Sequence, residues 1–184
     1  MFYHDLLMSF FQEIGEEKGI VFQKNLPAVE PVYGELKSPI HWRLEEILKK
    51  GNLTRFYSHQ VDAINAIREG KHIVISTRTA SGKSLCYNLP VIESIMGNTS
   101  NKALYIFPSK ALAQNQAARL EKYNYAFYYG DFNYGIYDGD THEETRRKLR
   151  KNAGIIITTP DMVHIGILPN HEKWKHFFQN LKFV

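Results

Sequence analysis

One run of about 25 residues constrains this chain more than any other feature. A short apolar segment, "HIVIS" at 72–76, leads into "TRTASGKS" at 77–84, and a long helical pattern follows in "KSLCYNLPVIESIM". Binding a phosphate requires a glycine where the backbone approaches it, a lysine for charge and a hydroxyl for a magnesium ion. A strand must aim the loop, and a helix N-terminus must receive the anion. The run therefore predicts a phosphate-binding loop in an α/β fold.

The first half of the loop departs from the standard pattern G-x-x-x-x-G-K-[ST], because Thr77 stands where the first glycine belongs. In the second half, the backbone amides from Ala80 to Ser84 are predicted to surround the phosphates. Lys83 is expected to reach the β and γ oxygens, and Ser84 to hold magnesium. The competing interpretation is an ordinary turn between a strand and a helix.

After residue 70, β-branched or aromatic runs alternate with helical patterns. The segments 72–76, 103–107, 135–138 and 154–159 are predicted to be buried strands, and "LKFV" at 181–184 to open a further strand. This alternation indicates a parallel sheet flanked by helices. Thr141 and Glu144 have the spacing of a capping box and predict a helix start there.

Residues 1–37 differ in character from the rest. An apolar stripe predicts an N-terminal helix, followed by a linker punctuated by proline, and residues 38–184 form the α/β domain; the stripe consists of Leu6, Leu7, Phe10, Phe11 and Ile14. We identify no signal peptide and no membrane span, and the single cysteine suits a reducing compartment, so we expect a cytoplasmic protein without a membrane partner. The net charge of +4 permits a polyanionic partner.

Five segments together resemble the successive motifs of superfamily-2 DEAD/DEAH-box helicases. The resemblance extends from about residue 38 to the end, and the segments are "YSHQ" at 57–60, "TRTASGKS" at 77–84, "PSKALAQNQ" at 108–116, "YDGDT" at 137–141 and "TTPDMVHIGIL" at 158–168. The long forms "SGKSLCYNLP" and "TTPDMVH" most resemble the MrfA-type subgroup of DNA-repair helicases. In that superfamily alanine is common at the first loop position, so Thr77 is a tolerable variant.

The resemblance implies the first RecA-like domain of an ATP-dependent helicase, with ATP and Mg²⁺ as ligands. It implies that Gln60 reads the adenine edge, although a solvated position on a helix is the plainer interpretation of that residue. The implied nucleotide-binding residues are Tyr57, Gln60, Thr77, Arg78, Thr79, Ala80, Ser81, Gly82, Lys83 and Ser84, with Lys83 and Ser84 catalytic and Ser84 the metal ligand. The implied nucleic-acid-binding residues are Ser109, Lys110, Gln114, Thr159, Pro160 and Asp161.

The implied partners are single-stranded or partly duplex DNA, with RNA possible, and a second RecA-like domain. ATP hydrolysis also needs an acidic pair that positions water, and no apolar run in these 184 residues ends in Asp-Glu. In the superfamily that motif follows a strand that begins like "LKFV". We therefore expect a RecA-like domain truncated at its C-terminal end, which binds nucleotide without meaningful turnover. A small-molecule phosphotransferase, an RNA helicase and a non-catalytic binding module are the other interpretations.

Overall fold

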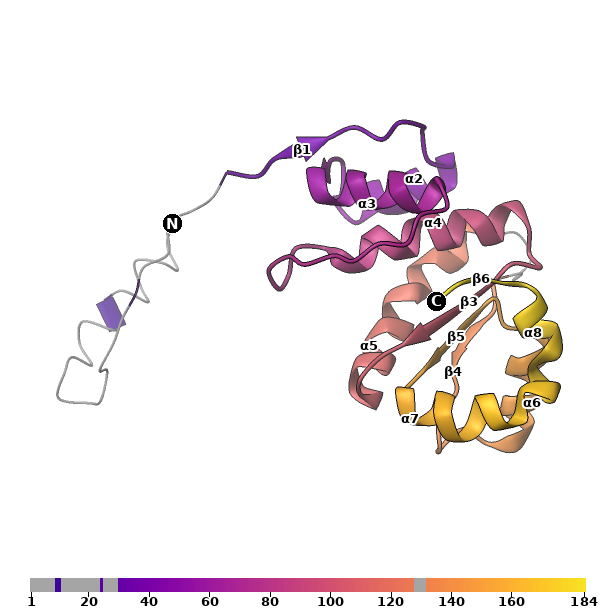
Figure 1. Ribbon diagram of the computed structural model, residues 1–184. Helices are drawn as coiled ribbons and strands as arrows, with labels where there is room; N and C mark the ends of the chain where they lie inside the picture. The colour runs from indigo at the N-terminus through magenta and orange to yellow at the C-terminus, as the bar shows by residue number, and fades with distance from the viewer. Residues whose placement is uncertain (1–8, 11–23, 25–29, 128–131) are drawn as a thin grey trace. The chain divides into compact units, whose positions relative to one another are not determined.

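The computed structural model describes residues 9–10, 24, 30–127 and 132–184 (Figure 1). The chain divides into two units, Met1–Pro31 and Val32–Val184, and every element named below belongs to the second unit. Apart from Phe10, the predicted N-terminal stripe lies outside the described residues. The helix predicted there therefore stays a prediction.

A four-stranded parallel sheet forms the centre of the second unit. Its strands run in the order β4-β5-β3-β6, with β3 at Lys102–Ile106, β4 at Tyr134–Ile136, β5 at Ile155–Thr158 and β6 at Leu181–Phe183. In the parallel register Ile106 lies opposite Thr158, and Ile136 lies opposite Ile157. The sequence prediction of these four strands and of a parallel sheet is confirmed.

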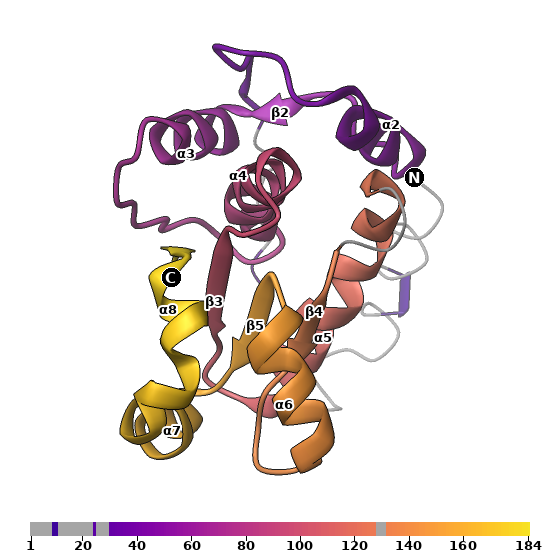
Figure 2. The same ribbon diagram turned by 90° about the vertical axis from the view of Figure 1, so that its right-hand side faces the viewer.

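Helices cover both faces of the sheet (Figures 1 and 2). The longer helices are α2 (Trp42–Lys50), α3 (Ser58–Arg68), α4 (Lys83–Gly97), α5 (Lys110–Leu120) and α6 (Glu143–Asn152). The shorter ones are η2 (Glu121–Ala126), α7 (Pro160–Met162), η3 (Val163–Ile167), η4 (Leu168–Trp174) and α8 (Lys175–Gln179). None of the helices in the described ranges is long and apolar enough to cross a membrane.

The strand residues alternate between two cores, as expected for a sheet with both faces covered. Tyr105 and Ile157 belong to a cluster that includes Ile95 of α4 and Leu120 of α5. The second cluster contains Leu104 and Ile156 of the sheet together with Ile167, Trp174 and Phe177 of the helical segments after β5. The sheet is therefore held rigidly between two apolar layers, and this fixes the loops at the carboxyl ends of its strands.

The strand predicted at 72–76 is absent from the structure, and this prediction is wrong. These residues have no regular secondary structure and make no backbone hydrogen bond to another described residue. Val74 is 97% exposed, although its apolar neighbours in sequence suggested burial. A β-strand is stable only in a ladder with a partner, and no described strand runs beside this segment.

The predicted capping box at the start of α6 is also not formed. The N-cap of α6 is His142, and no side chain caps the helix. The hydroxyl of Thr141 instead donates to Oδ1 of Asp138 over 2.8 Å. The residues "DGDT" at 138–141 therefore form a closed turn of their own after β4.

A separate two-stranded antiparallel sheet leads into helix α3. Strand β1 (Tyr33–Gly34) pairs with β2 (Phe56–Tyr57), and β2 leads directly into α3. Arg68 of α3 donates two hydrogen bonds to the carboxylate of Glu93 on α4, over 3.0 and 2.7 Å. This half-buried bidentate pair fixes α3 against α4, the helix that follows the candidate phosphate loop.

Candidate phosphate-binding loop and sheet edge

The glycine of the Gly-Lys-Ser run sits at the N-terminus of a long helix. Gly82 is the N-cap of α4 and has a φ of 77° and a ψ of 23°, in the left-handed region that favours glycine. A Cβ at this position would collide with Nε2 of Gln60. The peptide dipoles of α4 present partial positive charge to the loop, and no acidic residue in the first turn offsets it. The predicted helix after the loop is thus found, whereas the strand predicted to precede the loop at 72–76 is not.

Lys83 turns its ammonium group back into the loop. Its Nζ donates to the carbonyl oxygens of Thr77, over 2.8 Å, and of Arg78, over 2.7 Å. The hydroxyls of Thr77 and Ser81 lie 2.6 Å apart in a hydrogen bond that joins the two ends of the loop. Thr77 therefore closes the loop through its side chain, at the position where the standard pattern has a glycine.

Ser84, the predicted metal ligand, has a partner that sequence reasoning missed. Nη1 of Arg119 on α5 donates to Oγ of Ser84 over 3.3 Å. Arg119 has no carboxylate partner among the ion pairs of the described residues. No local pattern indicated this contact, because the two residues are 35 positions apart on different helices.

Gln60 is buried, with 2% of its surface exposed, so the interpretation as a solvated helix residue is wrong. Its Oε1 accepts from the backbone N–H of Tyr57 over 3.0 Å, and its Nε2 donates to the carbonyl of Gly82 over 3.3 Å. His59 adds a 3.0 Å contact from its Nε2 to the carbonyl oxygen of Ser81. Side chains at the start of α3 therefore hold the candidate phosphate loop through its backbone carbonyl groups.

Tyr57 belongs to a column of rings that the sequence did not predict. Its ring stacks on Tyr33 at 5.4 Å between centroids and on His59 at 5.7 Å. The guanidinium of Arg55 lies 3.7 Å from the centre of the Tyr33 ring. Tyr57 is 38% exposed, so part of its ring remains available to a ligand beside Gln60.

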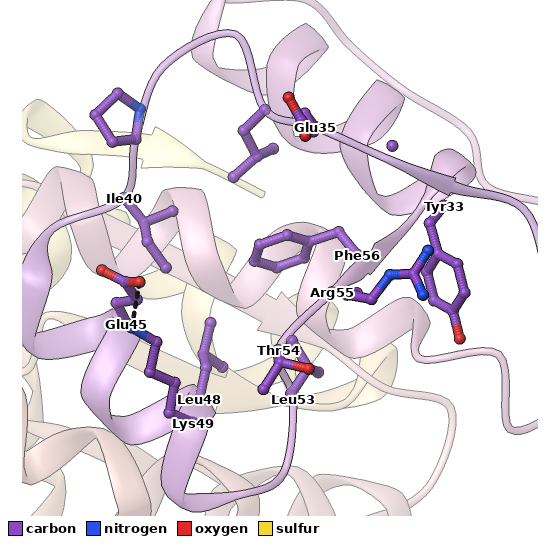
Figure 3. A pocket seen from close by; sticks show the side chains of 13 residues that line it. Tyr33, Glu35, Ile40, Glu45, Leu48, Lys49, Leu53, Thr54, Arg55 and Phe56 are labelled. Carbon is purple, nitrogen blue, oxygen red and sulfur yellow. Dashed lines mark ion pairs between the residues drawn. The ribbon is translucent and has the colours of Figure 1, made fainter.

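A pocket of about 490 Å³ lies next to this column (Figure 3). Tyr33, Arg55 and Phe56 line one part of it, and Ile40, Leu48 and the Glu45–Lys49 ion pair line another. None of the residues predicted to bind nucleotide is among those that line it. The pocket is thus separate from the candidate phosphate site.

The second group of predicted residues lies at the carboxyl edge of the sheet. Ser109 and Lys110 follow β3, and Thr159 to Asp161 follow β5, its direct neighbour. The N–H of Phe107 donates to the carbonyl of Thr158 over 2.9 Å, which brings the two segments side by side. In open α/β sheets ligands bind at this edge.

The side chains in these two segments face solvent. Ser109, Lys110, Gln114, Pro160 and Asp161 are exposed and Thr159 is half-buried. The Ser109 hydroxyl accepts from the N–H of Leu112 and caps α5 over 3.3 Å. Lys110 makes a 2.6 Å ion pair with Asp140 in the turn after β4, a contact that the sequence also did not predict.

Comparisons with known proteins show which family and which solved structures this chain is similar to. A family model described as DEAD/DEAH box helicase matches residues 57–184. The chain is 41% identical over 179 residues to the uncharacterized ATP-dependent helicase YprA of Bacillus subtilis, covering 96% of this chain and 24% of that protein. It is also 41% identical over 158 residues to the ATP-dependent helicase hrq1 of Schizosaccharomyces pombe, covering 85% of this chain and 15% of that protein.

Among solved structures, the chain is similar to the DUF1998 helicase MrfA bound to DNA and AMPPNP. The TM-score is 0.82 at 40% identity, over 92% of this chain and 24% of that one. MrfA bound to DNA alone gives a TM-score of 0.77 at 43% identity, over 83% of this chain and 22% of that one. The chain thus spans a quarter or less of the length of these relatives.

Proposed function

Because this chain belongs to the DEAD/DEAH box helicase family, we propose that it is the ATP-binding part of an ATP-dependent DNA helicase. The observation that carries the proposal is the loop at the start of α4, with Gly82 in a left-handed conformation and Lys83 directed into the loop. The relatives that match over most of this chain are ATP-dependent helicases, and MrfA binds DNA and AMPPNP. The whole protein would couple ATP hydrolysis to movement along a single strand, in DNA repair.

The loop has the groups that a nucleoside triphosphate requires. Lys83 would exchange the carbonyl oxygens of Thr77 and Arg78 for phosphate oxygens, which are stronger acceptors for an ammonium group. The absent side chain of Gly82 allows close approach of the backbone, and the α4 N-terminus favours an anion. Ser84 offers the hydroxyl oxygen that suits Mg²⁺, an ion that neutralises phosphate charge when bound.

The base of the nucleotide would lie beside the start of α3. Gln60 can both donate and accept through its amide, as an adenine edge requires, and Tyr57 presents an exposed ring next to it. To contact a base, Gln60 would give up its hydrogen bonds to Tyr57 and Gly82. We therefore propose that adenine binding and the position of the loop are linked through Gln60.

A nucleic-acid strand would lie along the carboxyl edge of β3 and β5. Hydroxyl groups, an ammonium group and helix N-termini contact phosphates without reading sequence, which suits a motor that moves along any strand. Ser109 and Lys110 at the start of α5 and Thr159 after β5 supply these groups. We propose DNA as the strand, since MrfA is bound to DNA and is similar over most of this chain.

Turnover requires groups beyond the phosphate loop. An acidic pair that positions the attacking water is one such group, and the sequence contains no Asp-Glu dipeptide. We propose that a second RecA-like domain of the same polypeptide supplies arginines to the γ-phosphate. The 184-residue chain by itself would bind nucleotide and strand without separating a duplex.

Two titrations of the purified chain test this function against a phosphotransferase. Fluorescence titration with a labelled ATP analogue, competed by ATP and GTP, measures nucleotide binding and base preference. Anisotropy titration with fluorescein-labelled (dT)20 and U20 measures strand binding. We expect binding of both ligands, with salt-sensitive and sequence-tolerant affinity for the strand. Tight ATP binding with no affinity for either strand would favour the phosphotransferase.

A further inference from the structure

A set of partly buried hydrogen bonds fixes the turn after β4. Asp138 is 8% exposed, and its Oδ1 accepts from the N–H of Asp140 over 3.0 Å and from the hydroxyl of Thr141 over 2.8 Å. Arg146 donates through Nη2 to the carbonyls of Asp138 and Gly139, over 2.7 and 3.2 Å. The backbone of Asp140 is thereby fixed, and the motif "YDGDT" gains a structural explanation.

The carboxylate of Asp140 takes no part in this turn and points to Lys110 instead. Its Oδ2 lies 2.6 Å from Nζ of Lys110, and the side chain is 79% exposed. Lys110 follows β3 and Asp140 follows β4, with β5 between them in the sheet. Thr159, which begins the other proposed strand-binding segment, follows β5.

Stability does not explain the pair, because exposed ion pairs contribute little to folding. The hydrogen bond with Asp140 raises the pKa of Lys110, and the same bond lowers the pKa of Asp140, so both groups are charged at neutral pH. A carboxylate oxygen at this distance occupies a donor direction that a phosphate oxygen would otherwise use. A phosphate at Lys110 would also be repelled by the Asp140 charge.

We propose that Asp140 competes with the nucleic-acid backbone for Lys110, so that a phosphate bound at Lys110 must displace the Asp140 carboxylate or share the ammonium group with it. This inference rests on the proposed function, in which Lys110 contacts the strand. The turn holds Asp140 in place, and its carboxylate lowers the affinity for nucleic-acid strands of every sequence alike. Asp140 is thus a residue that sets the strength of strand binding without itself contacting the strand.

The test is an anisotropy titration of fluorescein-labelled (dT)20 with the chain and with its Asp140→Asn variant, at several potassium chloride concentrations. This substitution removes the charge and keeps the size of the side chain. We expect about two- to fivefold tighter binding, with the largest gain at low salt. Unchanged or weaker binding by the variant would overturn the proposal. Asp140→Ser provides a second variant, and thermal melting confirms that each is folded.

Glu144→Gln is the matched control, because it changes the net charge by the same amount. Glu144 pairs with Lys148 on α6 over 2.8 Å and does not contact Lys110. We expect its affinity for (dT)20 to match that of the parent chain. An equal gain in Glu144→Gln and Asp140→Asn would show a general effect of charge and would overturn the specific role of Asp140.

Lys110→Ala separates this inference from the proposed function. If Lys110 contacts the strand, the single variant binds less tightly, and Asp140→Asn added to it brings a smaller gain than it brings in the parent chain. If Lys110→Ala leaves affinity unchanged, the proposed strand site itself is wrong. If Lys110→Ala weakens binding while Asp140→Asn has no effect, only the competition is wrong.

Discussion

Lys83 donates a 2.8 Å hydrogen bond to the carbonyl oxygen of Thr77, the residue that replaces the first glycine of the standard phosphate loop. Thr77 begins the loop, and Lys83 follows it at the first position of α4. A hydrogen bond of 2.6 Å between the hydroxyls of Thr77 and Ser81 closes the loop. A glycine could not make that side-chain bond. The variant loop is therefore a structured one, in which a hydroxyl pair performs part of the closure.

Gly82→Ala should both destabilise the chain and abolish nucleotide binding. The left-handed backbone at Gly82 costs about 1–3 kcal/mol for a residue with a Cβ, and that atom would also collide with Gln60. Urea denaturation measures the stability, and titration with the labelled ATP analogue measures the affinity. Gly97→Ala is the control, because a Cβ there meets nothing within 4 Å. Equal losses in the two variants would contradict this account.

Gln60→Ala should weaken the attachment of α3 to the loop. The variant leaves the N–H of Tyr57 and the carbonyl of Gly82 without the partners that the buried amide supplies. We expect the free energy of unfolding to fall by about 1–3 kcal/mol, and the preference for ATP over GTP to be lost. Asn115→Ala removes an exposed amide and should change neither quantity. A stable variant that still prefers ATP would show that Gln60 has neither role.

Glu69 should make stability depend weakly on pH in acid, because its ion pairs with Lys37 and Lys71 are exposed. Hydrogen bonds from Lys37 and Lys71 lower the pKa of Glu69 from 4.5 to about 2 in the folded chain. Because the folded-state pKa of Glu69 is depressed, the contribution of its ionised carboxylate to stability is present above pH 4.5 and is lost as the pH falls toward 2. The stability difference between the chain and Glu69→Gln, from urea denaturation, should shrink over that interval. A stability difference between the two proteins that does not vary with pH would contradict this role of Glu69.

Lys110 should contribute one phosphate contact to strand binding. In Lys110→Ala the slope of log K against log salt for (dT)20 should decrease by about 1, since one fewer counterion is released. Affinity should fall for all sequences alike, because the contact is to the backbone. Lys50→Ala, in the last turn of α2, serves as the control for loss of a positive charge. An unchanged slope in Lys110→Ala would mean that this lysine makes no phosphate contact.

The sequence predicted the elements whose signals are local. The runs at 103–107, 135–138, 154–159 and 181–184 all contain strands, because apolar β-branched residues suit a sheet packed on both faces. The run at 72–76 has a similar composition but is not a strand. The composition of a segment indicates that it could form a strand, but a strand also needs a neighbouring strand to pair with. Val74 has no such neighbour among the described strands.

Contacts between distant residues were beyond the reach of sequence patterns. Arg119 with Ser84 and Lys110 with Asp140 join residues 35 and 30 positions apart, and only the packed sheet brings them together. The same is true of Gln60, whose burial depends on the loop folding back over α3. The motifs located the candidate sites, while the electrostatic partners within those sites required the structure.

We propose that the loop before α4 binds the phosphates of ATP, and Lys83→Ala removes the charged group that is expected to meet the β and γ oxygens. Titration with the labelled ATP analogue in the presence of Mg²⁺ should show at least about a tenfold loss of affinity, since a charge-assisted hydrogen bond to phosphate is removed. Circular dichroism should show a folded variant, because Lys83 is at the first position of α4 and outside the apolar core. Superimposable titration curves for the chain and a folded Lys83→Ala variant would contradict the claim.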